Sequence, residues 1–205
     1  MAEDAPATPI PALDSRPAVI DFLLTRRSRA AKTLTPERPD EAALATMLAA
    51  AVRVPDHGML TPWRFLQIER EAMPGLAEAA RRRMGALGSD AAAAEKAANQ
   101  FAMGGLIVAV VSAPVASAKI PRWEQELSAG AVCATLLNAA LALGWGANWL
   151  TGPLARDDGF LAEALGLAPG ETVAGFVHIG GEGARPAERR RPDPAALVTR
   201  IGADQ

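Results

Sequence analysis

The sequence predicts an α+β fold of three layers, in which a small mixed sheet lies between helices. Segments with helical periodicity alternate along the chain with short runs of β-forming residues. The run 106–112, LIVAVVS, is rich in β-branched residues and is typical of a buried central strand. The stretch 121–152 has no charge after Glu126 and is apolar on two sides of a helix, so this helix must be covered twice.

The first half of the chain is predicted to be mainly helical. Asp40 suits the N-cap of a helix that ends before Pro55, and the run 63–68 alternates enough to form a strand. The helices expected in this half are 18–26, 40–52, 71–84 and 90–99. A loop at 55–62 therefore joins a helix to a strand.

The second half is built around the long helix. Gly144 suits the left-handed residue that ends it, and strands at 147–150 and 172–179 are expected on either side of a short helix, 158–165. The segment 180–200 is rich in Gly, Pro and Arg, so we expect it to wrap over a surface or a neighbouring chain.

The long helix carries two apolar lines side by side. The first comprises Leu127, Ala131, Ala134, Leu137 and Leu141, and the second comprises Val132, Leu136, Ala139 and Leu143. We expect the first line to pack on the chain's own sheet and the second to be covered by a partner subunit. The stretch is also long enough to cross a bilayer, but Asn138 and Asn148 would lie unpaired in lipid, which favours a soluble central helix.

The composition limits the classes of binding partner and the cellular compartment that we expect for this protein. The chain has 205 residues, a net charge of -2 and a single cysteine, Cys133, inside the apolar helix. These values favour neither nucleic acid nor an anionic membrane as a partner, and they exclude a disulfide or a cysteine-ligated metal site within one chain. We expect a cytoplasmic protein with a flexible tail at 1–17, which lacks the apolar core of a secretory signal, followed by one domain at 18–205.

Several self-contained catalytic motifs are absent from the sequence, namely G-x-x-x-x-G-K-[ST], H-E-x-x-H, G-x-S-x-G and C-x-x-C. The tripeptide 144–146, GWG, imitates the start of a dinucleotide-binding motif, but it closes a helix where that motif opens one. His57 and His178 are the only histidines and there is no tyrosine, so acid–base groups are few. An organic cofactor with its own reactivity is therefore favoured, and no metal site is expected.

A basic cluster follows the first helix. Arg26, Arg27 and Ser28 combine two guanidinium groups with a hydroxyl, which suits a phosphate group. A solvated, basic helix end would give the same pattern, so the residues alone leave both readings open.

The loop between the second helix and the first strand is a further candidate. Arg53, His57 and the run 62–65, PWRF, crowd a segment held between rigid elements, where functional residues often lie. Alternatively, His57 hydrogen-bonds the turn and Trp63 belongs to the core.

Four segments, taken in order, resemble the nitroreductase family. They are the Arg-Arg-Ser triplet at 26–28, Pro-Asp-His at 55–57 leading into PWRF, the central helix that begins PRWEQELSAG at 121, and GWGANWLTG at 144–152. The similarity runs from about residue 18 to the end and is nearest to the small bacterial NAD(P)H nitroreductases. It implies an FMN-binding, intertwined homodimer with two flavin sites at the subunit interface.

The resemblance also implies which residues bind the cofactor. The positions that hold the phosphate end of FMN are matched by Arg26, Arg27 and Ser28. The positions that reach the flavin from the partner chain are matched by Arg53 and His57. The segment that lines the other side of the flavin is matched by Trp149, Leu150 and Thr151.

This chain departs from the wider family in places. The tripeptide 59–61, MLT, stands where many members have an asparagine before Gln-Pro-Trp, so a side-chain bond to the flavin edge is in doubt. The basic residue that often follows the triplet is displaced, with Arg29 and Lys32 as candidates. The arginines 189–191 could supply a late phosphate contact or form a solvated run.

The function implied is that of an oxidoreductase that passes hydride from NADH or NADPH through FMN to nitroaromatic or quinone-type acceptors by a ping-pong mechanism. Such chemistry needs no protein nucleophile, in keeping with the missing motifs. Other flavin reactions on the same fold, such as dehalogenation, enoyl reduction or flavin breakdown, are alternatives, as is a non-catalytic flavin-binding dimer.

Overall fold

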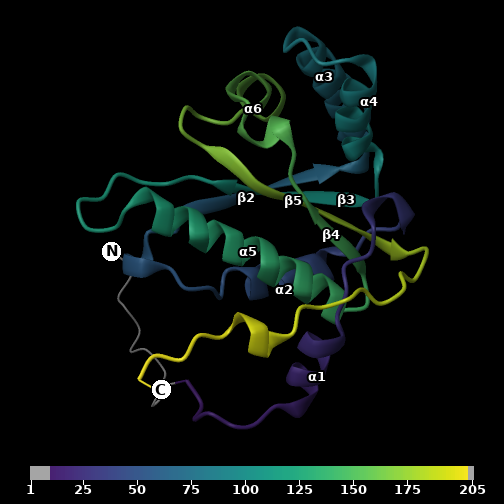
Figure 1. The fold of residues 1–205 in the computed structure, drawn as a ribbon. Helices are drawn as coiled ribbons and strands as arrows, with labels where there is room; N and C mark the ends of the chain where they lie inside the picture. The colour runs from purple at the N-terminus through teal and green to yellow at the C-terminus, as the bar shows by residue number, and fades with distance from the viewer. Residues whose placement is uncertain (1–9, 203–205) are drawn as a thin grey trace.

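The computed structural model describes residues 10–202 and has three layers, with a five-stranded sheet between two groups of helices (Figure 1). Strand β5 (Thr172–Glu182) pairs along one side with β3 (Leu106–Ser112) and along the other with β4 (Gly146–Leu150). β2 (Trp63–Glu69) pairs with the free side of β3, and the short β1 (Leu34–Thr35) pairs with the end of β5. The α+β class expected from the sequence is confirmed.

The sheet itself differs from the expected mixed one, because all its strand pairs within residues 10–202 are antiparallel. Helix α5 (Arg122–Ala142) connects β3 to β4, and these two strands run in the same direction because both are antiparallel to β5. A helical connection of this kind is typical of two strands that pair in parallel. These two strands do not pair, since β5 lies between them with Ile179 aligned to both Leu106 and Ala147. Because β5 separates β3 from β4, no parallel pair forms between those two strands and the sheet is antiparallel.

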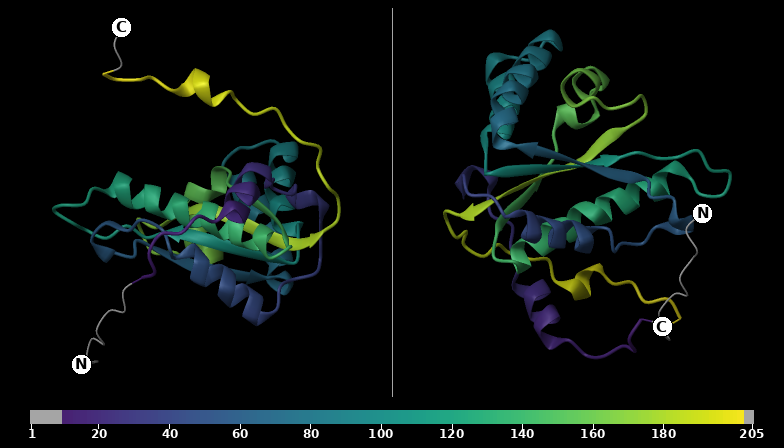
Figure 2. Two further views of the ribbon diagram at one scale, coloured as in Figure 1. Left: turned by 90° about the horizontal axis from the view of Figure 1, so that it is seen from below. Right: turned by 180° about the vertical axis from the view of Figure 1, so that it is seen from behind.

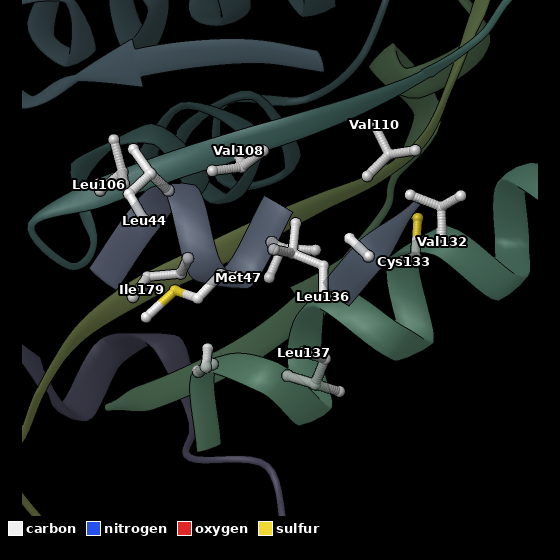
Figure 3. Close-up of a cluster of buried hydrophobic side chains, with 14 of the residues drawn as sticks. Leu44, Met47, Leu106, Val108, Val110, Val132, Cys133, Leu136, Leu137 and Ile179 are labelled. Atoms are coloured by element: carbon white, nitrogen blue, oxygen red, sulfur yellow. The ribbon is translucent and has the colours of Figure 1, made fainter. Parts of the chain in front are cut away.

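One face of the sheet is covered by α5 and by α2 (Glu41–Ala51), whose N-cap Asp40 accepts a hydrogen bond from the Ala43 N–H. In Figure 3, side chains of both helices converge on alternate residues of β3, such as Val108 and Val110. This cluster fixes the position of α5 on the sheet.

The other face is covered by α3 (Met73–Ala86), α4 (Ala91–Asn99) and α6 (Asp158–Leu165), which lie above the sheet in Figure 1. Phe101 lies between two aromatic rings, with centroid distances of 5.6 Å to Phe160 and 5.3 Å to Phe176. β3 therefore has buried side chains on both faces, as its apolar sequence predicted.

The two apolar lines of α5 do not divide between sheet and solvent as expected. Val132 and Leu136 of the second line are buried against the sheet together with Leu137 of the first. Leu127 of the first line is 65% exposed. Periodicity shows that both lines are apolar but not which one meets the sheet. The uncovered line of α5 is therefore only the part that starts at the exposed Leu127 and continues through the half-buried Ala131 and Ala134. Across residues 10–202, none of the helices has both the length and the apolar character of a membrane span.

Both ends of the described chain are poorly covered. Helix α1 (Pro17–Thr25) has no buried residue, and Leu23 and Leu24 on it are exposed. The segment 183–202 is almost wholly exposed and curves away from the body of the molecule (Figure 2). Of the expected tail at 1–17, residues 1–9 lie outside the described part, and residues 10–16 form no helix or strand.

Candidate functional site

Two hollows lie along α5, one beside its N-terminal half and one beside its C-terminal end. The cationic hollow, about 280 Å³, lies near the C-terminal end of the helix and is lined by Arg26, Arg27, Arg29, Leu141, Trp145 and Glu182, among others. The imidazole hollow, about 250 Å³, lies near its N-terminal half and is lined by Pro55, His57, Pro62, Glu124, Leu127 and Ser128, among others. Of the sequence-predicted residues, Arg26 and Arg27 line the cationic hollow and His57 lines the imidazole hollow, whereas Ser28 and Arg53 line neither.

The cationic hollow forms where the chain leaves α1. Arg26 is the first residue after the helix and has an extended backbone (φ -59°, ψ 142°). Three residues later, the Arg29 N–H donates to the Ala147 carbonyl at 2.9 Å, which ties the segment to β4. The Arg26 guanidinium donates to Ser28 Oγ at 2.9 Å. The triplet is thus fixed to the sheet and is not a loose, solvated helix end.

The charges in this hollow are unevenly compensated. Arg29 donates to Glu182 through Nε, and this hydrogen bond is the main cause that holds the pKa of Glu182 below its ordinary value. Arg26 and Arg27 form no ion pair with any residue of the described part, and the buried Arg26 Nε has no hydrogen-bond partner there. Burial, with Arg191 and Arg29 nearby, lowers the pKa of Arg26. A bound anion would satisfy these groups.

The arginines 189–191 do not all fit the same interpretation, which was either a phosphate contact or a solvated run. Arg191 lies near enough to Arg26 to lower its pKa, although it also donates to Glu188 at 3.2 Å. Arg189 and Arg190 are exposed, like the segment around them. Lys32 is exposed and does not line the cationic hollow, so Arg29 is the basic residue after the triplet that does.

The imidazole hollow depends on a tightly built loop. The Asp56 carboxylate accepts hydrogen bonds from the N–H groups of Leu60 (3.1 Å) and Thr61 (2.8 Å). Met59 and Thr61 have positive φ angles of 51° and 48°, which non-glycine residues seldom adopt. Such strain persists only where the surrounding contacts impose it, and it is frequent at functional sites.

The same loop is anchored to α5. Ser128 Oγ donates to the Pro55 carbonyl at 2.7 Å and accepts from Trp63 Nε1 at 3.1 Å. Trp63 is buried, so its core role is confirmed. His57 Nδ1 lies 2.7 Å from Glu124 Oε1, and Arg53 is exposed with no ion pair to any described residue.

The length of α5 separates the two hollows within one chain. The helix has 21 residues, which at about 1.5 Å per residue gives roughly 30 Å. Glu124, which pairs with His57, is 17 residues or roughly 25 Å from Leu141, which lines the hollow of Arg26. Within one chain, His57 and Arg26 therefore lie toward different ends of α5.

The third predicted cluster lies along and just after β4. Trp149 Nε1 donates to the Ala174 carbonyl at 3.2 Å, and its indole lies over Gly175, where a Cβ atom would come within 2.1 Å of it. Leu150 is half-buried. Thr151 is exposed and lines a crevice of only about 10 Å³ beside Gln100. The cationic hollow contacts the opposite end of this strand, at Gly146.

Glu124, Ser128 and Glu182 escaped the sequence analysis. Glu124 and Ser128 are four residues apart in PRWEQELSAG, so they share a helix face, and this spacing could have linked both to the loop. No local pattern marks Glu182, because its partner Arg29 lies 153 residues earlier in the chain. Within residues 10–202 there is no group of His, Cys, Asp and Glu side chains that could hold a metal ion.

The family model described as "Nitroreductase family" matches residues 23–181 of the chain. "Putative NAD(P)H nitroreductase YdjA" of Escherichia coli (strain K12) is 34% identical over 181 residues, which cover 88% of this chain and 97% of the relative. The chain belongs to the nitroreductase family. Both hollows lie within or close to the matched region.

Solved structures of nitroreductases share the fold. A nitroreductase-like family protein from Bacillus cereus superposes with a TM-score of 0.74 at 20% identity, covering 94% of this chain and all of that one (100%). A nitroreductase with bound FMN from Bacteroides fragilis gives a TM-score of 0.68 at 20% identity, with 89% and 98% of the two chains covered. At these identities the likeness establishes the fold alone.

Proposed function

We propose that this chain is an FMN-dependent NAD(P)H nitroreductase that acts as a homodimer, with each flavin site shared between two subunits. The family membership, the NAD(P)H nitroreductase relative and the FMN-bound neighbour all support this activity. The observation that carries the proposal is the pair of hollows along α5, each of which holds only part of the expected flavin-binding set.

The residues of the cationic hollow fit the phosphate end of FMN. Arg26 has a buried, unpartnered Nε, and Arg27 beside it is free of ion pairs with described residues. Guanidinium forks and the Ser28 hydroxyl are suitable donors to phosphate oxygens. A phosphate bound there would meet uncompensated positive charge, since Glu182 is engaged by Arg29.

Other residues would complete the site. Arg53 and His57 of the second subunit would approach the flavin from the imidazole hollow, and Trp149, Leu150 and Thr151 would line its other side. The uncovered line of α5 gives the subunits a surface on which to meet. A Cβ atom at Gly130 would meet no other atom within 4 Å, so a second helix can approach closely there.

FMN, when bound, supplies the redox chemistry by accepting hydride from NADH or NADPH and passing electrons to a second substrate. The chain's own residues bind, orient and shield the cofactor, and none of them needs to act as a nucleophile. We propose nitroaromatics and quinones as acceptors, bound after the nicotinamide leaves in a ping-pong sequence, in the cytoplasm.

Reduction of the purified protein by NADPH under anaerobic conditions tests this proposal. A yellow dimer that loses its flavin absorbance with NADPH and regains it with a nitroaromatic is the expected result. Recovery with an enoyl or halogenated acceptor but not with a nitroaromatic would instead support another flavin reaction on this fold. Yellow protein that NADPH cannot bleach would indicate a non-catalytic flavin binder, and protein unable to take up FMN would contradict the proposal altogether.

A further inference from the structure

His57 and Glu124 form a side-chain pair whose role the family resemblance does not assign. His57 Nδ1 lies 2.7 Å from Glu124 Oε1, and both residues line the imidazole hollow. Glu124 lies in the first turn of α5, where the helix dipole favours a carboxylate. His57 lies on the loop that Asp56 and Ser128 hold in place. The pair therefore joins two rigid elements in the lining of the hollow.

The chemistry of the pair fixes the proton on the imidazole. A carboxylate can only accept a hydrogen bond, so Nδ1 must donate and must carry the ring proton. In a neutral imidazole, Nε2 is then the acceptor nitrogen. The His57 side chain is 61% exposed, and Nε2 forms no hydrogen bond with any residue from 10 to 202. Nε2 is thus available to a bound molecule.

We infer that Glu124 is a positioning residue, which holds His57 as the Nδ1–H tautomer so that Nε2 accepts a hydrogen bond from a hydroxyl or N–H group of the bound cofactor. The inference rests on the proposed function for the identity of that cofactor, FMN. It assigns Glu124 a role through His57 and no direct contact with the flavin. A purely structural contact between loop and helix would leave the tautomer without consequence for binding.

The tautomer can be measured without the cofactor. The chain has only two histidines, so ¹⁵N-labelled imidazole signals can be assigned by comparison with His57→Ala. Wild-type protein, at a pH where imidazole is neutral, is expected to show the Nδ1–H form. Glu124→Gln keeps an acceptor oxygen and should retain this form, whereas Glu124→Leu should shift His57 to Nε2–H.

Glu126 offers a matched control. It lies two residues further along α5 and accepts from Arg122 at 2.8 Å, away from His57. Glu126→Leu should leave the tautomer unchanged. A wild-type Nε2–H form, or a Glu124→Leu protein that keeps Nδ1–H, would overturn the inference.

The second readout is the dissociation constant for FMN. Loss of one hydrogen bond should weaken FMN binding roughly 2- to 10-fold in Glu124→Leu and similarly in His57→Ala. The double variant should lose no more than His57→Ala alone, because Glu124 acts through His57. Additive losses would contradict the inference. Wild-type protein unable to bind FMN would contradict the proposed function, while the tautomer in that same protein would still decide whether Glu124 orients His57.

Discussion

The cationic and imidazole hollows are nearly equal in volume but opposite in character. Arginines dominate the first, two of them without an ion-pair partner in the described part of the chain. The second hollow is lined largely by prolines, Ile120 and Leu127, and His57 and Glu124 form their contact in the same lining. One hollow suits a phosphate and the other a flat, partly apolar ring, so each resembles half of a mononucleotide site.

The difference also indicates how two chains would combine. In a two-fold dimer, α5 helices packed antiparallel along their uncovered lines would bring the N-terminal half of one helix beside the C-terminal end of the other. The imidazole hollow of one subunit would then face the cationic hollow of its partner. The dimer and the cofactor site would be one structure.

The largest effect is expected from a charge placed on the uncovered line of α5. Leu127→Arg would require a guanidinium to be buried in the subunit interface, so we expect monomers and loss of nearly all bound FMN. Sedimentation and the ratio of flavin to protein measure both. The control is Leu87→Arg, because Leu87 is 51% exposed at the end of α3 on the other side of the sheet. A monomeric Leu127→Arg protein that still binds FMN would show that a single chain is sufficient for flavin binding.

Acid pH should lower the stability of the fold through His178, a core residue that lines neither hollow. His178 is fully buried in β5, its Nε2 has no partner in the described part, and burial lowers its pKa from 6.5 to about 4. Below pH 6.5 the unfolded chain binds a proton that the folded chain excludes, so stability falls as the pH drops. The loss should reach about 2.5 kcal/mol near pH 4.5.

Urea unfolding at a series of pH values measures this slope. His178→Leu should flatten the curve between about pH 6.5 and 4.5, because the group whose protonation differs between the folded and unfolded chains is then gone. A slope that survives in His178→Leu would place the sensitive group elsewhere. Below this range, carboxylates with a lowered pKa, such as that of Asp157 paired with Arg83, add their own loss of stability.

A smaller effect is expected from the cationic hollow. Arg26→Ala removes a charge-assisted contact worth about 1.5–3 kcal/mol, so FMN should bind roughly 10- to 100-fold more weakly. Arg82→Ala, on the exposed surface of α3, is the matched control and should bind FMN normally. Fluorescence titration of the apo-protein with FMN measures both. Unchanged affinity in Arg26→Ala would remove this residue from the phosphate site.

Much of the fold followed from local patterns. β3 was predicted from a run of β-branched residues, and both helix ends lie where the carboxylate of Asp40 and the backbone freedom of Gly144 suggested. The left-handed φ of 84° at Gly144 ends α5 as expected. Such signals depend on neighbours in sequence, which a single chain displays directly.

The errors concern contacts between distant segments. The expected mixed sheet failed because β5, the last strand, lies between β3 and β4. The division of α5 into a sheet-facing and a partner-facing line failed because both lines are apolar, and the sheet buries residues of each, such as Leu136 and Leu137. The triplet at 26–28 was found from its composition, but Glu182, which neutralises Arg29 beside it, is reached only through the folded sheet.

The most direct test of a shared site is a mixed dimer. One chain carries Arg26→Ala, the other carries Arg53→Ala, and separate affinity tags isolate the heterodimer. If each flavin lies between subunits, one site collects both lesions and the other has none, so the heterodimer should bind one FMN with wild-type affinity, which neither parental homodimer can do. If every site belongs to a single chain, each site keeps one lesion, and the absence of a wild-type site would contradict the account.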